Sequence, residues 1–233
     1  MATLDEHAYN IRNIIRANQG NSDDERLNIS QIKFWISAYR AKGVFDITQY
    51  GKQIDPQLVQ DMGVLKLKTV DKADSECPKV EWGCTVKYVD IPKIVDLPHN
   101  RALVFVGLID KQTPIIIDNA DVHIFKRATK FGNLFNRCYF INNRLYIVTK
   151  QGDESVKYIN IRAVFEDPTD VTVYTEDNPK GRCFDEANDE YPMPMRLYEY
   201  VLTSILRNEF QVSAQTINDE LNNGRQDNEK LRP

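Results

Sequence analysis

The spacing of the apolar residues changes twice along this chain, and that change limits the folds the chain can adopt. From residue 4 to about residue 42 they recur every three or four positions, as on one face of a helix. From residue 65 to residue 173 they follow the patterns of strands, and the helical spacing returns after residue 197. This order predicts an α+β fold, in which N-terminal and C-terminal helices pack together around an inserted, mainly antiparallel β region.

Capping residues set the bounds of the predicted N-terminal helices. Thr3 begins a T-x-x-E capping box, which predicts a helix over residues 4–17. A second helix is predicted over residues 31–42, with Ser30 as its N-cap and Gly43 as its C-cap. Each carries an apolar stripe at helical spacing, so we expect both to bury one face.

Two more helices are predicted by the same reasoning. Asp55 is placed to cap a short helix over residues 56–62, and Gly63 is placed to end it. The last long helix covers residues 197–206, where a two-residue-wide apolar stripe recurs.

Turn residues and alternation define the β region. Residues 101–110 are apolar on both faces, which predicts a central strand. Asn142 and Asn143 separate two short apolar runs and tolerate positive φ, so they predict a tight hairpin. Residues 159–165 alternate as in a strand with one buried face, which ends before Pro168.

These patterns divide the chain into four segments. The predicted N-terminal helices occupy residues 1–63, and the antiparallel β region occupies residues 64–175. An acidic loop and the C-terminal helix, residues 176–207, complete the helical part. Residues 208–233 are predominantly polar and form a predicted C-terminal arm.

Composition argues against several classes of protein. The formal net charge is −4, whereas proteins that hold nucleic acid by its phosphates carry a basic excess. No basic run precedes an apolar stretch at the start, and no segment reaches the roughly 18 apolar residues of a membrane span. The four cysteines lack the close spacing of zinc ligands, so we expect free thiols and folding in a cytoplasm.

The sequence contains no recognisable catalytic or cofactor-binding motif. The ten glycines form neither a phosphate-binding nor a dinucleotide-binding loop. Nor is there a nucleophile elbow. The acidic residues of 185–190 lack the ligand spacing and central glycine of a calcium loop, which favours a solvated loop. We therefore predict no enzyme activity, no metal and no cofactor, while a catalytic pair assembled only by the fold stays open as an alternative.

Two segments of opposite charge predict a contact between subunits. Around residues 125–137 basic residues are interleaved with phenylalanines. This pattern also occurs in proteins that bind single-stranded nucleic acid, and at the edge of a β-strand whose aromatic residues pack inward. Because the chain is acidic overall, we favour a contact with the acidic loop, residues 176–190, of a neighbouring subunit. The predicted interface residues are Lys126, Arg127, Lys130, Arg137, Asp185, Glu186, Asp189, Glu190, Tyr191 and Pro192.

Four stretches of sequence resemble a family of virion structural proteins from crAss-like bacteriophages, the tail ring or head–tail connector proteins found beneath the portal. They occur in the family's order and together reach across most of the chain, whereas residues 66–160 are less familiar. The matching residues are packing and turn signatures, and none is catalytic. The stretches are LDEHAYNIRNIIR at residues 4–16, ISQIKFWISAYRAK at 29–42, IRAVFEDPTDV at 161–171 and DEYPMPMRLYEYVLTSIL at 189–206, with NNG at 222–224.

The resemblance implies a subunit of a homo-oligomeric ring, with about twelve copies to match a portal. Such a ring would contact the portal or a neighbouring ring protein and line the channel through which the genome leaves. A mildly acidic protein neutralises few phosphates, which would let genomic DNA pass without specific binding. The resemblance also implies a location in the virion tail or neck after assembly in the host cytoplasm, with no cofactor and no membrane contact.

Two alternatives from other classes make different predictions. A monomeric adaptor or regulatory binding module would stay a monomer or dimer. An enzyme would contain a deep polar pocket with strongly perturbed titratable groups. A ring protein instead forms a large oligomer whose head-to-tail contact joins two different faces of the subunit.

Overall fold

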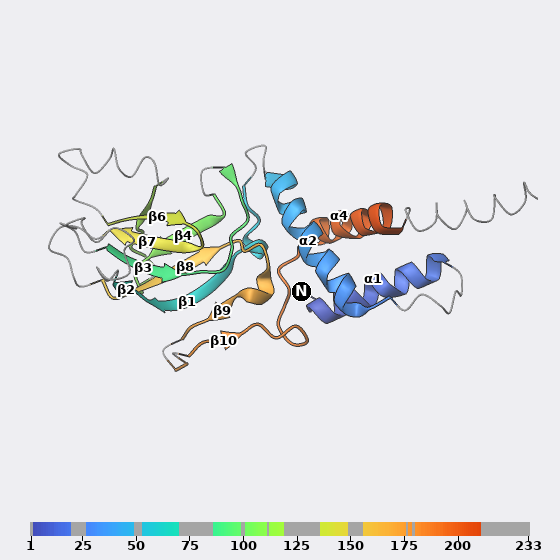
Figure 1. Ribbon diagram of the computed structural model, residues 1–233, viewed down its shortest axis with the longest axis horizontal. Coiled ribbons are helices and arrows are strands. Elements are labelled where there is room, and N and C mark those ends of the chain that lie inside the picture. The colour runs from blue at the N-terminus through green and yellow to red at the C-terminus, as the bar shows by residue number, and fades with distance from the viewer. Residues whose placement is uncertain are drawn as a thin grey trace, which may run out of the picture.

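A computed structural model shows a helical part beside a β part (Figure 1). The chain begins with helices, continues into sheets and then forms a helix that returns to the first ones. This arrangement confirms the predicted α+β fold. The structure describes residues 2–19, 27–48, 53–69, 86–98, 101–110, 112–118, 136–148, 156–175, 177–178 and 180–210.

Among the described residues, the helical part is formed by α1 (Leu4–Gln19), α2 (Ile29–Thr48) and α4 (Met195–Ile205). α2 packs against both α1 and α4, which confirms that the N-terminal helices pack against the C-terminal helix. α4 continues into a π-helical turn, η6 (Leu206–Phe210). In the described part of the chain, no helix combines the length and the apolar character needed to cross a membrane.

The capping box at the start of α1 is present as predicted. The backbone nitrogen of Thr3 donates to Oε2 of Glu6 at 3.0 Å, and the backbone nitrogen of Glu6 donates to Oγ1 of Thr3 at 3.2 Å. These bonds satisfy two of the donors that a helix N-terminus leaves unpaired. The predicted stripe of Leu4, Ala8 and Ile11 is buried, as is Ile15 one turn later.

Both predicted ends of α2 were wrong. The side chain of Asn28 accepts from the backbone nitrogen of Ser30 at 3.0 Å, so Asn28 caps the helix and Ser30 lies inside it. At the other end the helix runs past Gly43 to Thr48. Gly43 serves packing instead of capping, because a Cβ there would lie 2.6 Å from Cδ1 of Leu197 on α4.

The short helix predicted over residues 56–62 is only a 3-10 turn, η1 (Pro56–Leu58). Asp55 caps it as predicted, accepting from the backbone nitrogen of Gln57 at 2.9 Å. The chain then extends into strand β1 (Gln60–Lys66), so Gly63 lies in a strand and ends no helix. There it adopts a φ of 75° at a register shift in the pairing with the next strand.

The first sheet has three antiparallel strands in the order β1-β8-β4, with β8 (Tyr158–Ala163) at its centre. β4 (Leu103–Gly107), predicted to be central, is an edge strand of this sheet. Its apolar residues do not all face the core, since Val104 is 46% exposed. Part of the outer edge of β4 is covered by residues 113–115, where the backbone nitrogen of Ile115 donates to the carbonyl of Val106.

β8 is buried on both faces, whereas the alternating pattern predicted one. Asn160 is fully buried, although its place in the pattern predicted exposure. Its Nδ2 donates to Oδ1 of Asp61 at 2.7 Å and to the carbonyl of Gly63 at 2.9 Å. The irregular pairing of β1 thus supplies acceptors that allow a polar side chain inside the sheet.

The second sheet has five strands in the order β2-β3-β7-β6-β5. Asn142 and Asn143, with φ of 50° and 60°, join β6 and β7 in the predicted hairpin. All pairings in this sheet are antiparallel except that of β5 with β6. The strands are β2 (Lys68–Thr69), β3 (Val86–Asp90), β5 (Ile116–Ile117), β6 (Arg137–Ile141) and β7 (Arg144–Val148).

Small elements connect the sheets to the helical part. Asp167 caps the 3-10 turn η5 (Pro168–Asp170), which ends the β8 segment as the sequence predicted. The strands β9 (Thr172–Val173) and β10 (Arg182–Cys183) then pair as a small antiparallel ribbon.

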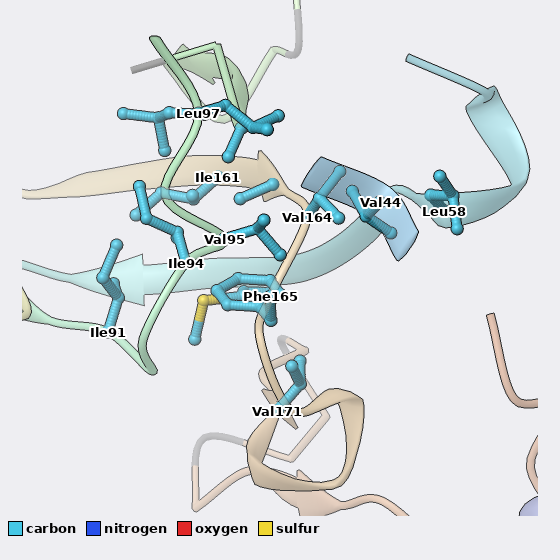
Figure 2. Close-up of a cluster of buried hydrophobic side chains, with 14 of the residues drawn as sticks. Val44, Leu58, Ile91, Ile94, Val95, Leu97, Ile161, Val164, Phe165 and Val171 are labelled. Carbon is cyan, nitrogen blue, oxygen red and sulfur yellow. The ribbon is translucent and has the colours of Figure 1, made fainter. Parts of the chain in front are cut away.

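A buried cluster joins the two parts. Figure 2 shows Val44 of α2 beside Val164 and Phe165, which follow β8, with Val95 and Ile94 from the segment after β3. All of these side chains are buried. Apolar contacts of this kind hold the helical part directly against the β part.

Candidate assembly surface

Arg40 connects α2 to the β part from inside the core. It lies four residues from both Ile36 and Val44 on the core-facing side of α2, and its side chain is fully buried. Its Nε donates to the carbonyl of Pro192, and its Nη1 donates to the carbonyl of Phe165, both at 2.9 Å. One guanidinium therefore joins α2, the end of the β8 segment and the residues before α4.

The surroundings of Arg40 partly offset the cost of burying its charge. Loss of water lowers the pKa of Arg40, whereas Tyr191 and Asp167 favour the charged form. The ring of Tyr191 lies 5.7 Å from the guanidinium carbon. A planar fork that bridges two carbonyls requires arginine, because a lysine ammonium is a single point of charge. Sequence reasoning missed Arg40 because charged residues are rarely fully buried, and the only available signal was its spacing from the apolar residues of α2.

The acidic loop between β10 and α4 is a turn with its own hydrogen bonds. Asp185 accepts from Nδ2 of Asn188 at 2.8 Å and from the backbone nitrogen of Ala187 at 3.0 Å. These bonds lower the pKa of Asp185. Asp189 accepts from the backbone nitrogen of Asp185 and forms an ion pair with Arg182. Two of the predicted interface carboxylates therefore shape the loop itself.

The other two acidic residues attach this loop to the N-terminal helices. Nζ of Lys33 lies 2.6 Å from Glu186 and 2.5 Å from Asp5 on α1. Burial alone would lower the pKa of Lys33, but the two carboxylates outweigh it and raise the pKa. Glu190 forms an isolated antiparallel bridge with Thr3. The loop thus fastens the start of α1 and α2 to the C-terminal segment.

Tyr191 and Pro192, also predicted at the interface, lie inside the subunit. Tyr191 is fully buried, and burial raises its pKa to about 12. Pro192 is buried as well, and its carbonyl receives the hydrogen bond from Arg40. The first exposed residues after them are Met195 and Arg196, at the start of α4.

The basic run is described only at its end. Lys126, Arg127 and Lys130 lie outside the described residues. Nη1 of Arg137 lies 2.7 Å from Oδ2 of Asp118, whose side chain is almost fully buried. Arg137 is therefore paired within its own subunit, and the contact of this run with a neighbouring acidic loop stays a prediction.

An open groove of about 560 Å³ lies along the outer side of α2. The groove lies between the helical and β parts, and we call it the α2 groove. Its apolar lining comes from Phe34, Ala38 and Ala41, and its acidic wall comes from Glu166, Asp167 and Asp170.

The charges of the α2 groove are only partly balanced. Lys93 pairs with Glu166 at 2.7 Å, and Lys33 pairs with Glu186 at the end of the groove. Within the part of the chain that the structure describes, Asp167 and Asp170 have no ion pair. Partial burial and the nearby charge of Asp167 raise the pKa of Asp170. The groove therefore presents an apolar lining beside an excess of negative charge.

Residues of α2, α4 and η6 together form a surface of the opposite charge. A shallow hollow of about 640 Å³ is lined by the cations Lys42, Arg196 and Arg207 and by one carboxylate, Glu199. Among the described residues, none of these cations has a hydrogen-bond or ion-pair partner. Met195 lies beside Arg196 and is 68% exposed. We call these five residues the α4 surface.

Only some of the residues considered for chemistry lie in the part of the chain that the structure describes. His99, His123, Cys77 and Cys84 lie outside the described residues. His7 is buried beside Tyr198, with 5.1 Å between the ring centres, and burial lowers its pKa.

The described cysteines are both free thiols. Cys138 is buried and Cys183 is exposed. Over the described ranges, no three or more His, Cys, Asp or Glu side chains are arranged to hold a metal ion.

Comparison with known proteins identifies a family. A family model described as phage tail ring protein 2 matches residues 6–228. No curated protein matches the sequence. The match covers three of the four stretches on which the resemblance to the crAss-like phage tail ring proteins was based and residues 6–16 of the first, and it confirms that resemblance.

Proposed function

The chain belongs to the phage tail ring protein 2 family, a structural component of the virion tail, and from this we propose that it is the subunit of a homo-oligomeric ring. The ring contains about twelve copies, to match the symmetry of a portal. It connects the portal, directly or through another ring protein, to the rest of the tail and lines the channel for genome ejection. It assembles in the host cytoplasm, has no catalytic role and needs no cofactor.

The observation that carries this proposal is the family match over nearly the whole chain. The fold is compatible with it, because Arg40 and the buried cluster around Phe165 tie the helical and β parts together. A ring subunit benefits from such a connection while DNA passes, because independent motion of its two parts would weaken the contacts with neighbouring subunits. The net charge of −4 suits a channel that does not hold DNA.

Ring formation needs two different complementary faces on each subunit, because head-to-tail contacts join unlike surfaces. We propose that acidic residues on one face and basic residues on another make this contact. Of the predicted acidic residues, Asp185 and Glu190 are exposed. Glu186 borders the α2 groove. Lys126, Arg127 and Lys130 are the proposed basic partners from the neighbouring subunit.

Native mass spectrometry of the full chain at several concentrations tests the proposal. We expect a discrete species near twelve times the 27.0 kDa subunit mass, either alone or on addition of the cognate portal protein. A chain that stays monomeric in both conditions would contradict the ring and favour the monomeric adaptor. A continuous series of masses without a preferred size would indicate aggregation and would equally contradict a closed ring.

A further inference from the structure

α2 is apolar on two opposite sides, which is unusual for a helix at the surface of a subunit. Its core side is formed by residues such as Ile36. On its outer side Phe34 is 65% exposed and Phe45 is 40% exposed. Ala38 and Ala41 lie between them, so the outer stripe is spaced by four, three and four residues. A helix that is apolar all round is normally buried, and exposed apolar patches mark contact sites.

The subunit's own α4 lies on the other side of α2. It packs where Gly43 leaves room for Leu197 and Tyr200. Gly43 and Ala41 are about 160° apart around the helix axis at 3.6 residues per turn. Figure 1 likewise shows α4 and the β part on different sides of α2. The described part of the chain thus leaves the outer stripe exposed, and a second molecule can cover it.

The α4 surface has the complementary chemistry. The α2 groove holds four carboxylates, Glu166, Asp167, Asp170 and Glu186, against two lysines. The α4 surface holds three cations against one carboxylate. Its exposed methionine is long and unbranched, and such a side chain adapts to an irregular apolar surface. The small alanines of α2 leave space for it between two phenylalanines.

We propose that the α2 groove of one subunit receives the α4 surface of a second copy of this chain. Met195 lies over Ala38 and Ala41, and Arg196 faces Asp167 and Asp170. Because the two surfaces are made of different residues, the contact joins unlike faces of the subunit and repeats from one copy to the next. The inference rests on the proposed ring and adds a contact to the one proposed above between Lys126, Arg127 and Lys130 and the acidic loop.

Cysteine cross-linking tests the contact directly. In full-length chains carrying Cys77→Ser, Cys84→Ser and Cys183→Ser, one population receives Ala38→Cys and another receives Met195→Cys. After mixing and assembly, a short bismaleimide should link the two populations into covalent dimers. A chain with both substitutions should form a ladder of covalent oligomers. A population with Asp177→Cys, an exposed position outside both surfaces, replaces Ala38→Cys as the control and should form no dimers with Met195→Cys.

Charge reversal provides a second measurement. Asp170→Lys and Arg196→Glu should each raise the concentration needed for assembly about tenfold, because each places like charges together. The chain that carries both reversals should assemble nearly as well as the wild type. Asp177→Lys makes the same charge change elsewhere and should have little effect. A general loss of folding would lower the thermal unfolding temperature of a variant and would not be rescued by the second reversal.

The outcomes separate this inference from the ring itself. Rings of the expected mass that form without cross-links between Ala38→Cys and Met195→Cys would overturn the contact and leave the ring standing. Protection of Ala38→Cys from modification without such cross-links would mean that a different surface covers the groove, which also overturns it. Wild-type chains that never form rings, even with the portal, would overturn both.

Discussion

Replacing Arg40 by methionine tests whether this buried guanidinium stabilises the subunit. The substitution keeps much of the side-chain volume but removes the donors to the carbonyls of Pro192 and Phe165. Each carbonyl that loses its partner costs about 1–3 kcal/mol, while removal of a buried charge returns part of its desolvation free energy. We expect a net loss of about 3 kcal/mol for Arg40→Met, and about 5 kcal/mol for Arg40→Ala, which also leaves a cavity.

Urea unfolding followed by circular dichroism measures this loss, at concentrations where the chain is monomeric. A loss of about 3 kcal/mol is a large share of the roughly 5–15 kcal/mol that stabilises a typical domain. Lys42→Ala, an exposed substitution two residues further along α2, should change the free energy of unfolding by less than about 0.5 kcal/mol. If Arg40→Met were as stable as that control, the guanidinium would not stabilise the subunit and the reasoning would be refuted.

Three further predictions concern packing, protonation and thiol reactivity. Gly43→Val should lower the free energy of unfolding by about 1–3 kcal/mol in the same urea assay, because its Cβ would overlap Leu197 and Tyr200; unchanged stability would show that α4 can move away. Burial lowers the pKa of His7 from 6.5, so the unfolded chain binds the proton first and stability should fall as the pH drops below 6.5. Thermal unfolding at about pH 5.5 and 7.5 should show a smaller difference in His7→Gln than in the wild type, and equal differences would contradict this. Maleimide should modify exposed Cys183 in the folded protein but not Cys138, because burial raises the pKa of the Cys138 thiol. Mass spectrometry measures the modification, and early reaction at Cys138 would contradict this prediction.

Local features could be predicted because they depend on neighbours in the sequence. The capping box at Thr3 and the hairpin at Asn142 and Asn143 each involve groups only a few residues apart. Their formation follows from backbone geometry that those residues favour in most contexts. The change from helical to strand spacing likewise predicted the α+β fold before any contact was known.

The candidate surface was only partly predictable, because a sequence does not show which charged residues pair within the subunit and which stay exposed. The acidic run of residues 185–190 was predicted to face a neighbouring subunit, yet Glu186 pairs with Lys33 and Asp189 with Arg182. Lys33 lies far from this run in the sequence, and the pairing of Arg182 depends on how the loop folds. The unpaired charges beside the α2 groove, Asp167 and Asp170, belonged to a turn that the sequence marked only as the end of a strand.

The sequence by itself determined which segments are helices and strands, where several of them begin, and the family to which the chain belongs. Only the tertiary structure decided that Gly43 is a contact point inside a helix, that β4 lies at an edge and that Arg40 is buried. The physical reason is the range of the interactions. Caps, turns and periodicity arise within a few residues, whereas burial, strand order and ion pairing depend on groups that folding brings together from distant parts of the chain.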